Sequence, residues 1–256
     1  MALPNTIRIE VFLSRSQADE MQLKDKNVVV IDVLRASTTI ATALYNGAKE
    51  VIPVSSIEHA AKISGNMAGD VILRAGERNA KMIEGFNLGN SPLEYTREVV
   101  GGKSIIFVTT NGSGAIVRGR HAKHLLVGAF VNLGTVVGAL AQLREDVTII
   151  CSGQSENFCL EDAVCAGKII QDLKSARAGN IELDDAGQAV LSLEKGYGKN
   201  ILKMLKQSEH GQFLAEIGFG DDLKYCAGVD TVPVLPLFSG NTLRAGGELK
   251  RRPAQA

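Results

Sequence analysis

Charged and hydroxyl side chains follow apolar segments at several places in this sequence, and their types suit the binding of a phosphate group. At the first place, Asp32 ends an apolar run, Arg35 follows it, and Ser37 and Thr38 stand at the start of a predicted helix. The free N–H groups of a helix N-terminus and a nearby arginine together form a common anion site. A plain helix cap beside a surface arginine is the alternative interpretation, and position alone does not separate the two.

The second place combines a charged pair with a later turn. Glu77 and Arg78 follow the apolar residues 71–73 after a short interval, which favours a role for them in binding. Asn90 and Ser91 follow in a segment that continues Pro-Leu-Glu. That spacing is typical of a capping box, so on spacing alone we expect Ser91 to cap a helix.

The third place is Thr110, Asn111 and Gly112, after the apolar residues 104–108. Small hydroxyl residues and glycine let backbone N–H groups approach a phosphate closely. No Gly-Lys-Ser/Thr follows, so the segment is not a Walker A loop. A turn built on Asn-Gly is the alternative interpretation.

The last two places are Ser152 with Gly153, after the apolar residues 147–151, and Glu161 with Asp162. The adjacent carboxylates begin a predicted helix, where acidic residues usually complement the helix dipole. The alternative is a site for a hard cation, because Mg²⁺ binds one or two carboxylates together with substrate oxygens.

These groups must be positioned by an α/β fold, because apolar runs alternate with helical patterns along the chain. We expect a three-layer α/β/α arrangement with a largely buried sheet, since residues 28–31 are a continuous β-branched run. Residues 184–223 look helical throughout, which predicts a helical C-terminal part. Residues 232–238 predict a last strand, and the prolines at 233 and 236 favour a sheet edge or an extended segment for it. The predicted strands are residues 7–12, 28–33, 50–54, 71–73, 104–109, 124–127 and 147–151, and the clearest predicted helices are residues 133–144 and 160–177.

Ligands of open α/β sheets bind at the carboxyl ends of the strands. We therefore expect the polar residues that follow the strands to line one pocket: Asp32, Arg35, Glu77, Arg78, Asn111, Ser152, Glu161 and Asp162.

Length and charge narrow the class of protein. The 256 residues suit one α/β domain, or two closely packed lobes at about 1–130 and 131–240. Lys+Arg and Asp+Glu number 28 each, so no overall field attracts nucleic acid or an anionic membrane. Residues 1–10 lack the pattern of a signal peptide, and no apolar stretch approaches the roughly 20 residues that span a bilayer.

Cysteine and histidine usage agrees with a cytoplasmic location. Cys151, Cys159, Cys165 and Cys226 form no CxxC pair, and we expect reduced thiols. The four histidines lie outside any familiar zinc-ligand spacing, so a zinc site is not expected.

Two phosphatase mechanisms are excluded by spacing. A cysteine phosphatase needs an arginine six residues after its cysteine, where Cys151 is followed by Asn157 and Cys165 by Gln171. A haloacid-dehalogenase-type enzyme needs a second aspartate two residues after the first, where Leu34 stands. No Ser-His-Asp order is evident, and the motifs alone indicate an anion-binding α/β protein with metal assistance.

The motifs in combination are more specific than any one of them, and together they resemble the 2-phosphosulfolactate phosphatase family. The resemblance covers about residues 7–238. Asn87 and Ala80 depart from it, standing where aspartate and glycine are frequent in the family. The segments that carry the resemblance are DVLRASTTI at 32–40, GER at 76–78, GFNLGNSP at 85–92, TTNG at 109–112, LED at 160–162 and CAG at 165–167.

The resemblance implies hydrolysis of (R)-2-phospho-3-sulfolactate to (R)-3-sulfolactate and phosphate with Mg²⁺, the reaction of coenzyme M biosynthesis. Asp32, Glu161 and Asp162 are then expected to hold the metal, which neutralises phosphate charge and positions or activates the nucleophile. Arg35 and Arg78 are expected to neutralise the substrate anions. The substrate-binding set is completed by Ser37, Thr38, Glu77, Asn90, Ser91, Thr110, Asn111, Gly112, Ser152 and Gly153.

Several alternatives stay open at this point. The nucleophile is water, Asp32 or, as the weakest candidate, Cys151. The substrate is 2-phosphosulfolactate or another small phospho-acid, and a non-catalytic protein that binds a phosphorylated ligand is the competing class. Assembly into homodimers is compatible with the sequence.

Overall fold

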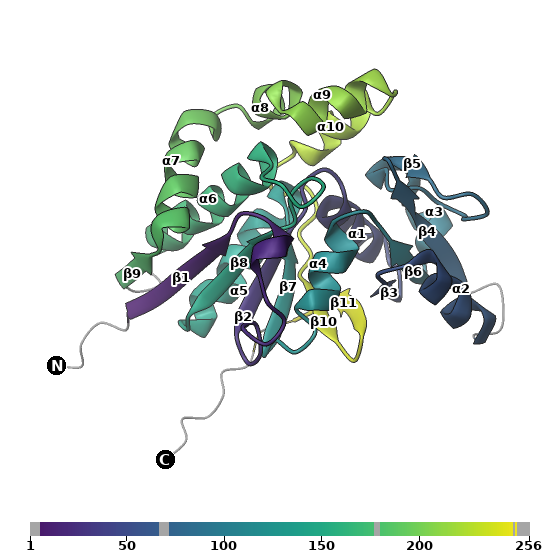
Figure 1. Cartoon of the computed structure of the whole chain (residues 1–256), viewed down its shortest axis with the longest axis horizontal. Coiled ribbons are helices and arrows are strands. Elements are labelled where there is room, and N and C mark those ends of the chain that lie inside the picture. Colours follow the sequence, from purple (N-terminus) through teal and green to yellow (C-terminus); the bar gives the residue numbers. More distant parts are fainter. Residues whose placement is uncertain (1–5, 67–71, 177–179, 248, 250–256) are drawn as a thin grey trace, which may run out of the picture.

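The computed structural model describes residues 6–66, 72–176, 180–247 and 249, and it has an α/β fold around one mixed sheet. The sheet order is β5-β4-β6-β3-β11-β10-β7-β2-β8-β1-β9, and helices cover both of its faces (Figure 1). The expected α/β class with a largely buried sheet is therefore confirmed. The strands are β1 Thr6–Phe12, β2 Asn27–Ile31, β3 Glu50–Pro53, β4 Ile72–Arg78, β5 Lys81–Met82, β6 Ser104–Val108, β7 His124–Gly128, β8 Val147–Cys151, β9 Asn180–Leu183, β10 Pro236–Ser239 and β11 Thr242–Ala245.

Strand β2 shows why the sheet is buried on both sides. Its side chains alternate between the two faces, so Val29 and Ile31 join one core while Val28 and Val30 join the other. All four are inaccessible to solvent, as expected for a strand without polar alternation. The first core includes residues of α5 (Leu133–Leu143), α6 (Leu160–Ser175) and α7 (Asp185–Tyr197), and the second those of α1 (Ala36–Tyr45) and α4 (Gly112–Arg118).

The sheet consists of two parallel parts joined by an antiparallel hairpin. Strands β4, β6 and β3 form one part, and β7, β2, β8, β1 and β9 form the other. The hairpin β10–β11 lies between them, with Leu237 opposite Leu126 of β7 and Leu243 opposite Val51 of β3. The expectation of an edge position for this segment is therefore wrong. Pro236 is the first residue of β10, a position at which a sheet accepts proline.

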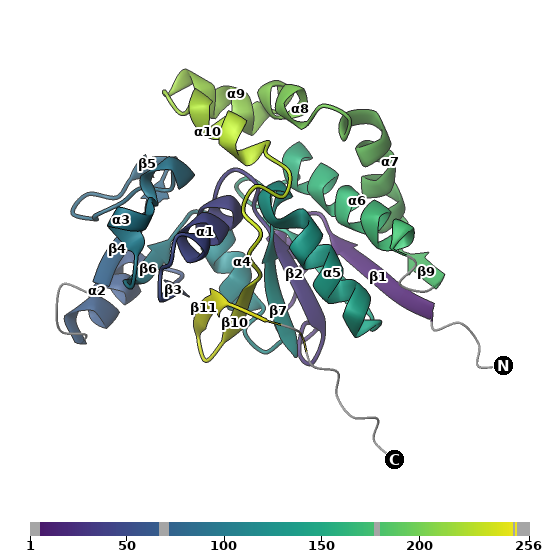
Figure 2. The same ribbon diagram turned by 180° about the vertical axis from the view of Figure 1, so that it is seen from behind.

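The helical C-terminal part is confirmed and forms a group of short helices: α8 (Ile201–Gln207), α9 (Glu209–Glu216) and α10 (Gly220–Cys226). Figures 1 and 2 show this group beyond one end of the sheet, at the top of both views. The break between α8 and α9 is capped by Ser208, whose side chain accepts a hydrogen bond from the N–H of Gly211. The remaining helices are α2 (Ile57–Asn66) and α3 (Arg97–Val100), with short 3₁₀ turns at Arg15–Gln17, Pro92–Glu94 and Phe130–Asn132.

One local difference from the sequence expectation affects the site. Strand β4 continues to Arg78, so Glu77 and Arg78 lie in the strand and not in a loop after it. Helix α2 and the strands β9 and β11 were not predicted. Residue 71, expected in β4, lies outside the described residues. Among the helices described, none has both the length and the apolarity needed to cross a bilayer.

Candidate active site

A cavity of about 300 Å³ lies where β2, β4 and β6 end, beside helix α9. Six of the residues expected from the sequence line it, namely Asp32, Arg35, Glu77, Asn90, Thr110 and Asn111. Helix α9 adds three that the sequence analysis missed: Glu209, His210 and Phe213. Of the eight residues expected to line one pocket, four do so, namely Asp32, Arg35, Glu77 and Asn111. The other four do not line this cavity: Arg78, Ser152, Glu161 and Asp162.

Asp32 is held at the end of β2 by the first turn of α1. Its Oδ1 accepts a hydrogen bond from the N–H of Ala36 at 3.0 Å. Ser37 closes the turn, because its N–H donates to the Asp32 carbonyl and its hydroxyl accepts from the Asp32 N–H. The Ser37 side chain thus shapes the loop and is not among the cavity-lining groups.

The Asp32 carboxyl group is only 6 % exposed, and burial raises its pKa from 3.8 to about 6. The N–H of Ala36 and the imidazole of His210 act in the opposite direction, whereas the carboxylates of Glu77 and Glu161 raise the pKa further. A carboxylate with an elevated pKa in a cavity is typical of a functional site.

Helix α4 begins directly against Asp32. A Cβ atom on Gly112 would lie 2.6 Å from the Cβ of Ala36 and 2.6 Å from Oδ2 of Asp32. Glycine at this position therefore allows the N-terminus of α4 to approach the carboxylate, which is how Gly112 serves the site.

Glu161, buried at the start of α6, is paired with the half-buried His210 of α9. Glu161 is 1 % exposed, and its Oε1 lies 3.2 Å from Nδ1 of His210. Its Oε2 is buried and has no hydrogen-bond partner within the described residues. The sequence placed His210 only within a helical region, and no spacing linked it to Glu161, which precedes it by 49 positions.

Asp162 has a different environment, because both of its carboxylate oxygens already accept backbone hydrogen bonds. Oδ1 accepts from Val33 at 2.9 Å and Oδ2 from Gly153 at 3.1 Å. Burial, followed by the charges of Asp32 and Glu161, raises its pKa well above the usual value. Asp162 thus joins the loops after β2 and β8, and it does not line the cavity.

Glu77 joins the loops after β4 and β6 in a similar way. Its Oε1 accepts from the N–H of Thr110 at 2.7 Å, and its Oε2 accepts from the N–H of Ala80 at 2.8 Å and the Thr110 hydroxyl at 3.1 Å. The Thr110 N–H expected to bind phosphate is therefore already engaged. Arg78 donates to the Glu77 carbonyl and does not line the cavity.

Arg35 is buried, with 2 % of its surface exposed, and is held from three directions. Nη1 donates to Oδ2 of Asp222 at 2.7 Å, and Nη2 donates to the carbonyl of Ala80 at 2.8 Å. Its guanidinium carbon lies 4.1 Å from the ring centre of Phe219. Because Arg35 is buried, the interpretation of it as a surface residue is excluded. Removing one partner of such a buried ion pair commonly costs about 3–5 kcal/mol of stability.

The second carboxylate oxygen of Asp222 binds the hydroxyl of Ser91. The Ser91 hydroxyl donates to Oδ1 of Asp222 at 2.6 Å, and it makes no capping hydrogen bond to the 3₁₀ turn that follows. Glu94 instead accepts from the N–H of Gly89 at 2.6 Å. The capping-box interpretation of the Ser91 side chain is therefore wrong, and Asp222 was missed because it lies 131 positions away.

The remaining predicted groups do not line the cavity. Thr38 donates to the carbonyl of Val33. Ser152 is fully buried, and its hydroxyl has no partner within the described part of the chain. Gly153 has φ +70°, and a side chain there would meet the carbonyl of Asn157.

The four cysteines all lie in the described residues, and all are buried free thiols. Cys151 is inaccessible, and burial, with the charge of Asp162 next in size, raises its pKa well above the usual value. A thiol in this state is a poor nucleophile.

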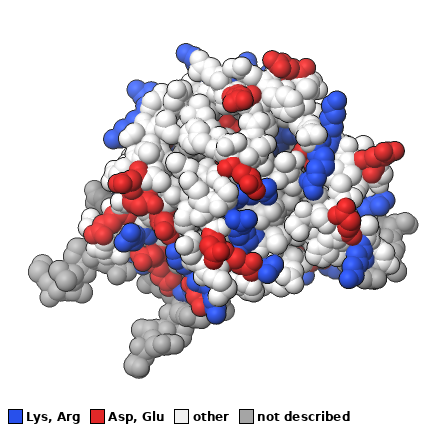
Figure 3. Space-filling model, in the orientation of Figure 1, with Lys and Arg blue, Asp and Glu red and all other residues white. Residues whose placement is uncertain are grey.

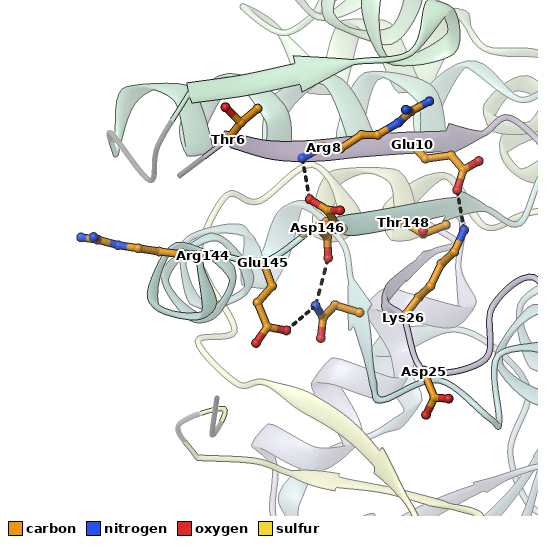
Figure 4. Close-up of a pocket in the computed structure, with 11 residues that line it drawn as sticks. Thr6, Arg8, Glu10, Asp25, Lys26, Arg144, Glu145, Asp146 and Thr148 are labelled. Atoms are coloured by element: carbon orange, nitrogen blue, oxygen red, sulfur yellow. Dashed lines mark hydrogen bonds and ion pairs between the residues drawn. The ribbon is translucent and has the colours of Figure 1, made fainter. Parts of the chain in front are cut away.

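A larger cavity of about 650 Å³ lies elsewhere, along β1, β2 and β8 (Figure 4). Some of its charged side chains form ion pairs with one another, such as Lys26 and Glu10 at 2.8 Å. None of the residues predicted for the site lines it. The smaller cavity is therefore the candidate active site.

Charge on the surface is mixed. On the face in Figure 3, acidic and basic side chains are interspersed, without an extended patch of one sign. Within the described residues, no three His, Cys, Asp or Glu side chains are grouped so that they could hold a metal ion by themselves.

Comparison with known proteins gives one consistent result. The sequence model of the 2-phosphosulpholactate phosphatase family matches residues 12–241. A protein from Caldanaerobacter subterraneus subsp. tengcongensis named "Probable 2-phosphosulfolactate phosphatase" is 41% identical over 92% of this chain and 97% of its own length. Proteins with the same name from Clostridium novyi and Gloeobacter violaceus are 40% and 42% identical, over 91% and 81% of this chain and 97% and 86% of their own lengths.

Proposed function

Because this chain belongs to the 2-phosphosulpholactate phosphatase family, we propose that it hydrolyses (R)-2-phospho-3-sulfolactate to (R)-3-sulfolactate and phosphate with Mg²⁺. The family places the chain among the phosphoric monoester hydrolases, as the sequence predicted. The observation that carries the proposal is that four of the family-like segments, which are far apart in the sequence, contribute residues to one small cavity.

The charge of the cavity supports the use of a metal. Its lining includes the carboxylates of Asp32, Glu77 and Glu209 but only one guanidinium, that of Arg35. The proposed substrate adds a phosphate, a carboxylate and a sulfonate. A hard divalent cation would offset this excess of negative charge, which one arginine does not balance.

Two carboxylates fit such a cation. Oδ2 of Asp32, which lines the cavity, accepts no hydrogen bond from the described residues. Oε2 of Glu161 is buried without a partner within the described residues, although Glu161 does not itself line the cavity. Mg²⁺ commonly uses one or two carboxylates and completes its shell with substrate oxygens and water. Asp162 would first have to lose its bonds from Val33 and Gly153, so Asp32 and Glu161 are the favoured ligands. When bound, Mg²⁺ would supply positive charge at the phosphate.

In the proposed reaction, an oxygen nucleophile forms a bond to phosphorus while the ester P–O bond breaks and the departing alcohol oxygen takes up a proton. If water attacks, it gives up a proton and phosphate forms directly; if the Asp32 carboxylate attacks, a water molecule then cleaves the P–O bond of the aspartyl phosphate and releases phosphate. Water and the Asp32 carboxylate remain the two candidates, because burial disfavours the Cys151 thiolate. Arg35, fixed by Asp222, orients the anionic substrate, and Phe213 of α9 adds an apolar side chain to the cavity wall.

Phosphate release from purified protein tests the proposal. Treatment with EDTA should abolish hydrolysis of 2-phospho-3-sulfolactate, and added Mg²⁺ should restore it; full activity in metal-free buffer would contradict the metal requirement. Phosphate release from 2-phospholactate and 2-phosphoglycerate, measured in parallel, shows whether the enzyme prefers 2-phospho-3-sulfolactate to other small phospho-acids. Tight binding of these esters without turnover would instead favour a non-catalytic binding protein.

A further inference from the structure

The side chain of Asn90 lacks a protein partner although it is almost fully buried. It is 5 % exposed and lines the candidate active-site cavity. Its Oδ1 is enclosed without a hydrogen bond within the described residues. The bond from Thr39 reaches the Asn90 carbonyl and leaves the Nδ2 group available as a donor. Buried amides in folded proteins are nearly always bonded, and an unpaired one needs a specific explanation.

The backbone around Asn90 is, in contrast, firmly held. Its carbonyl accepts from the Thr39 hydroxyl at 2.9 Å, and the carbonyl of Gly89 accepts from the Tyr95 hydroxyl at 2.7 Å. Ser91 is bonded to Asp222. The amide is thus presented to the cavity by a fixed backbone, and its lack of partners is not a sign of a loose loop.

Asn90 and Arg35 are connected through one carboxylate. Asp222 binds the Arg35 guanidinium with Oδ2 and the hydroxyl of Ser91, the neighbour of Asn90, with Oδ1. We call Arg35 and Asn90 the recognition pair. Both line the same cavity; Asp222 of α10 holds Arg35 directly and Asn90 only through the neighbouring Ser91.

The recognition pair is distinct from the carboxylates expected to act on the phosphate. Arg35 makes its ion pair with Asp222 and none with Asp32. Guanidinium and amide N–H groups are donors that suit the oxygens of a carboxylate or sulfonate. The cavity therefore offers acidic groups for a metal-bound phosphate and, separately, donors for a second anion.

We propose that Arg35 and Asn90 bind the non-reacting acid group of the substrate, with Asp222 as the positioning residue of Arg35, so that the enzyme selects phosphate monoesters that carry a second anion. This inference rests on the proposed function and specifies how that function selects its substrate. Arg35 supplies the charge, and the Nδ2 group of Asn90 donates hydrogen bonds.

The test compares two substrates in Asn90→Ala. For 2-phospho-3-sulfolactate, kcat/KM should fall by about 10- to 100-fold, mainly through KM, as for a lost hydrogen bond to a charged group. For ethyl phosphate, which has no second acid, kcat/KM should stay within about twofold. Equal losses on both substrates, or no loss on either, would overturn the proposal.

A binding measurement separates this inference from the proposed reaction. Calorimetry with (R)-3-sulfolactate should show weaker binding to Asn90→Ala than to the wild type, whether or not the ester is hydrolysed. The conservative variant Asn90→Gln should retain part of the affinity, whereas Asn90→Asp should bind least because it repels the anion. If the wild type hydrolyses another phosphomonoester but neither sulfolactate compound binds, the sulfolactate assignment and this inference both fail. Binding of sulfolactate that is insensitive to all three substitutions would reject the recognition pair alone.

Discussion

At the scale of one residue, the buried carboxylate of Asp32 is expected to serve the reaction while its charge lowers the stability of the fold. Its pKa is raised from 3.8 to about 6, so protons bind more tightly to the folded state than to the unfolded state. The stabilisation from this proton is fully present below about pH 3.8 and is lost as the pH rises through about 6. At neutral pH the folded protein therefore holds an ionised group that burial disfavours.

Asp32→Asn should consequently stabilise the metal-free protein at pH 7 while nearly abolishing phosphatase activity. Asparagine keeps Oδ1 to accept from Ala36 but removes the buried charge. We expect a gain in unfolding free energy on the order of 1–3 kcal/mol, measured by urea denaturation with EDTA present. The gain should shrink towards pH 4. A variant less stable than the wild type at pH 7 would show that burying the ionised carboxylate does not destabilise the folded protein.

Cys151→Ala should retain substantial activity, because the thiol is inaccessible and its pKa is raised well above the usual value. Phosphate release compared with Cys165→Ala, an equally buried cysteine in the same core, controls for loss of packing. An inactive Cys151→Ala beside an active Cys165→Ala, with a phosphocysteine trapped in acid, would establish the cysteine as nucleophile.

The sequence could predict residues that follow strands, but not those that reach the site from distant helices. Asp32 and Asn111 were predictable because carboxyl ends of parallel strands meet at one edge of a sheet. His210 and Asp222 lie in helices whose sequences carry no motif, and only the packing of α9 and α10 brings them to Glu161 and Arg35. The spacing around Ser91 predicted that its hydroxyl caps the next helix. In the structure this hydroxyl donates to Asp222, which is distant in sequence.

At the scale of elements, the approach of α4 to β2 depends on the absence of a side chain at Gly112. Gly112→Ala should reduce kcat/KM at least about tenfold, because its Cβ would meet Ala36 and Asp32 at 2.6 Å and displace the helix or the carboxylate. Activity assays and urea denaturation would measure both effects.

Gly138→Ala in α5 is the matched control. Apart from its chain neighbours and the nearby backbone of its own helix, no described heavy atom lies within 4 Å of the position that its Cβ would take. Alanine also favours helix by about 1 kcal/mol over glycine. This variant should keep full activity and gain slightly in stability. Similar activity losses in both variants would show that crowding at Asp32 is not the cause.

Continuous apolar runs predicted the central strands well, because β2, β6 and β8 are buried on both faces. Strand β4 was predicted too short, since its last residues are Gly-Glu-Arg, of which glycine and glutamate are usually depleted in strands. The hydrogen bonds from Thr110 and Ala80 to Glu77 explain why a glutamate is accepted there. Local composition did not contain that information.

At the scale of the whole molecule, the two parallel parts of the sheet are joined by the β10–β11 hairpin. Leu243→Ala should destabilise the protein by about 2–4 kcal/mol, because the leucine is fully buried between β3 and β10 and its removal leaves a cavity. Urea denaturation would measure the change, with the exposed Val229→Ala as control. A loss below about 1 kcal/mol would indicate that the sheet parts are held together by other contacts.

The position of the hairpin also bears on how the protein is made on the ribosome. Of the described strands, β10 and β11 are synthesised last, yet their partners β7 and β3 stand in the middle of the sheet. Until the hairpin emerges, the nascent chain has two unpaired strand edges, and such edges promote association between chains. Completion of the sheet, and with it the alignment of Asp32 with Glu77 across the active site, must therefore follow the end of translation of this region.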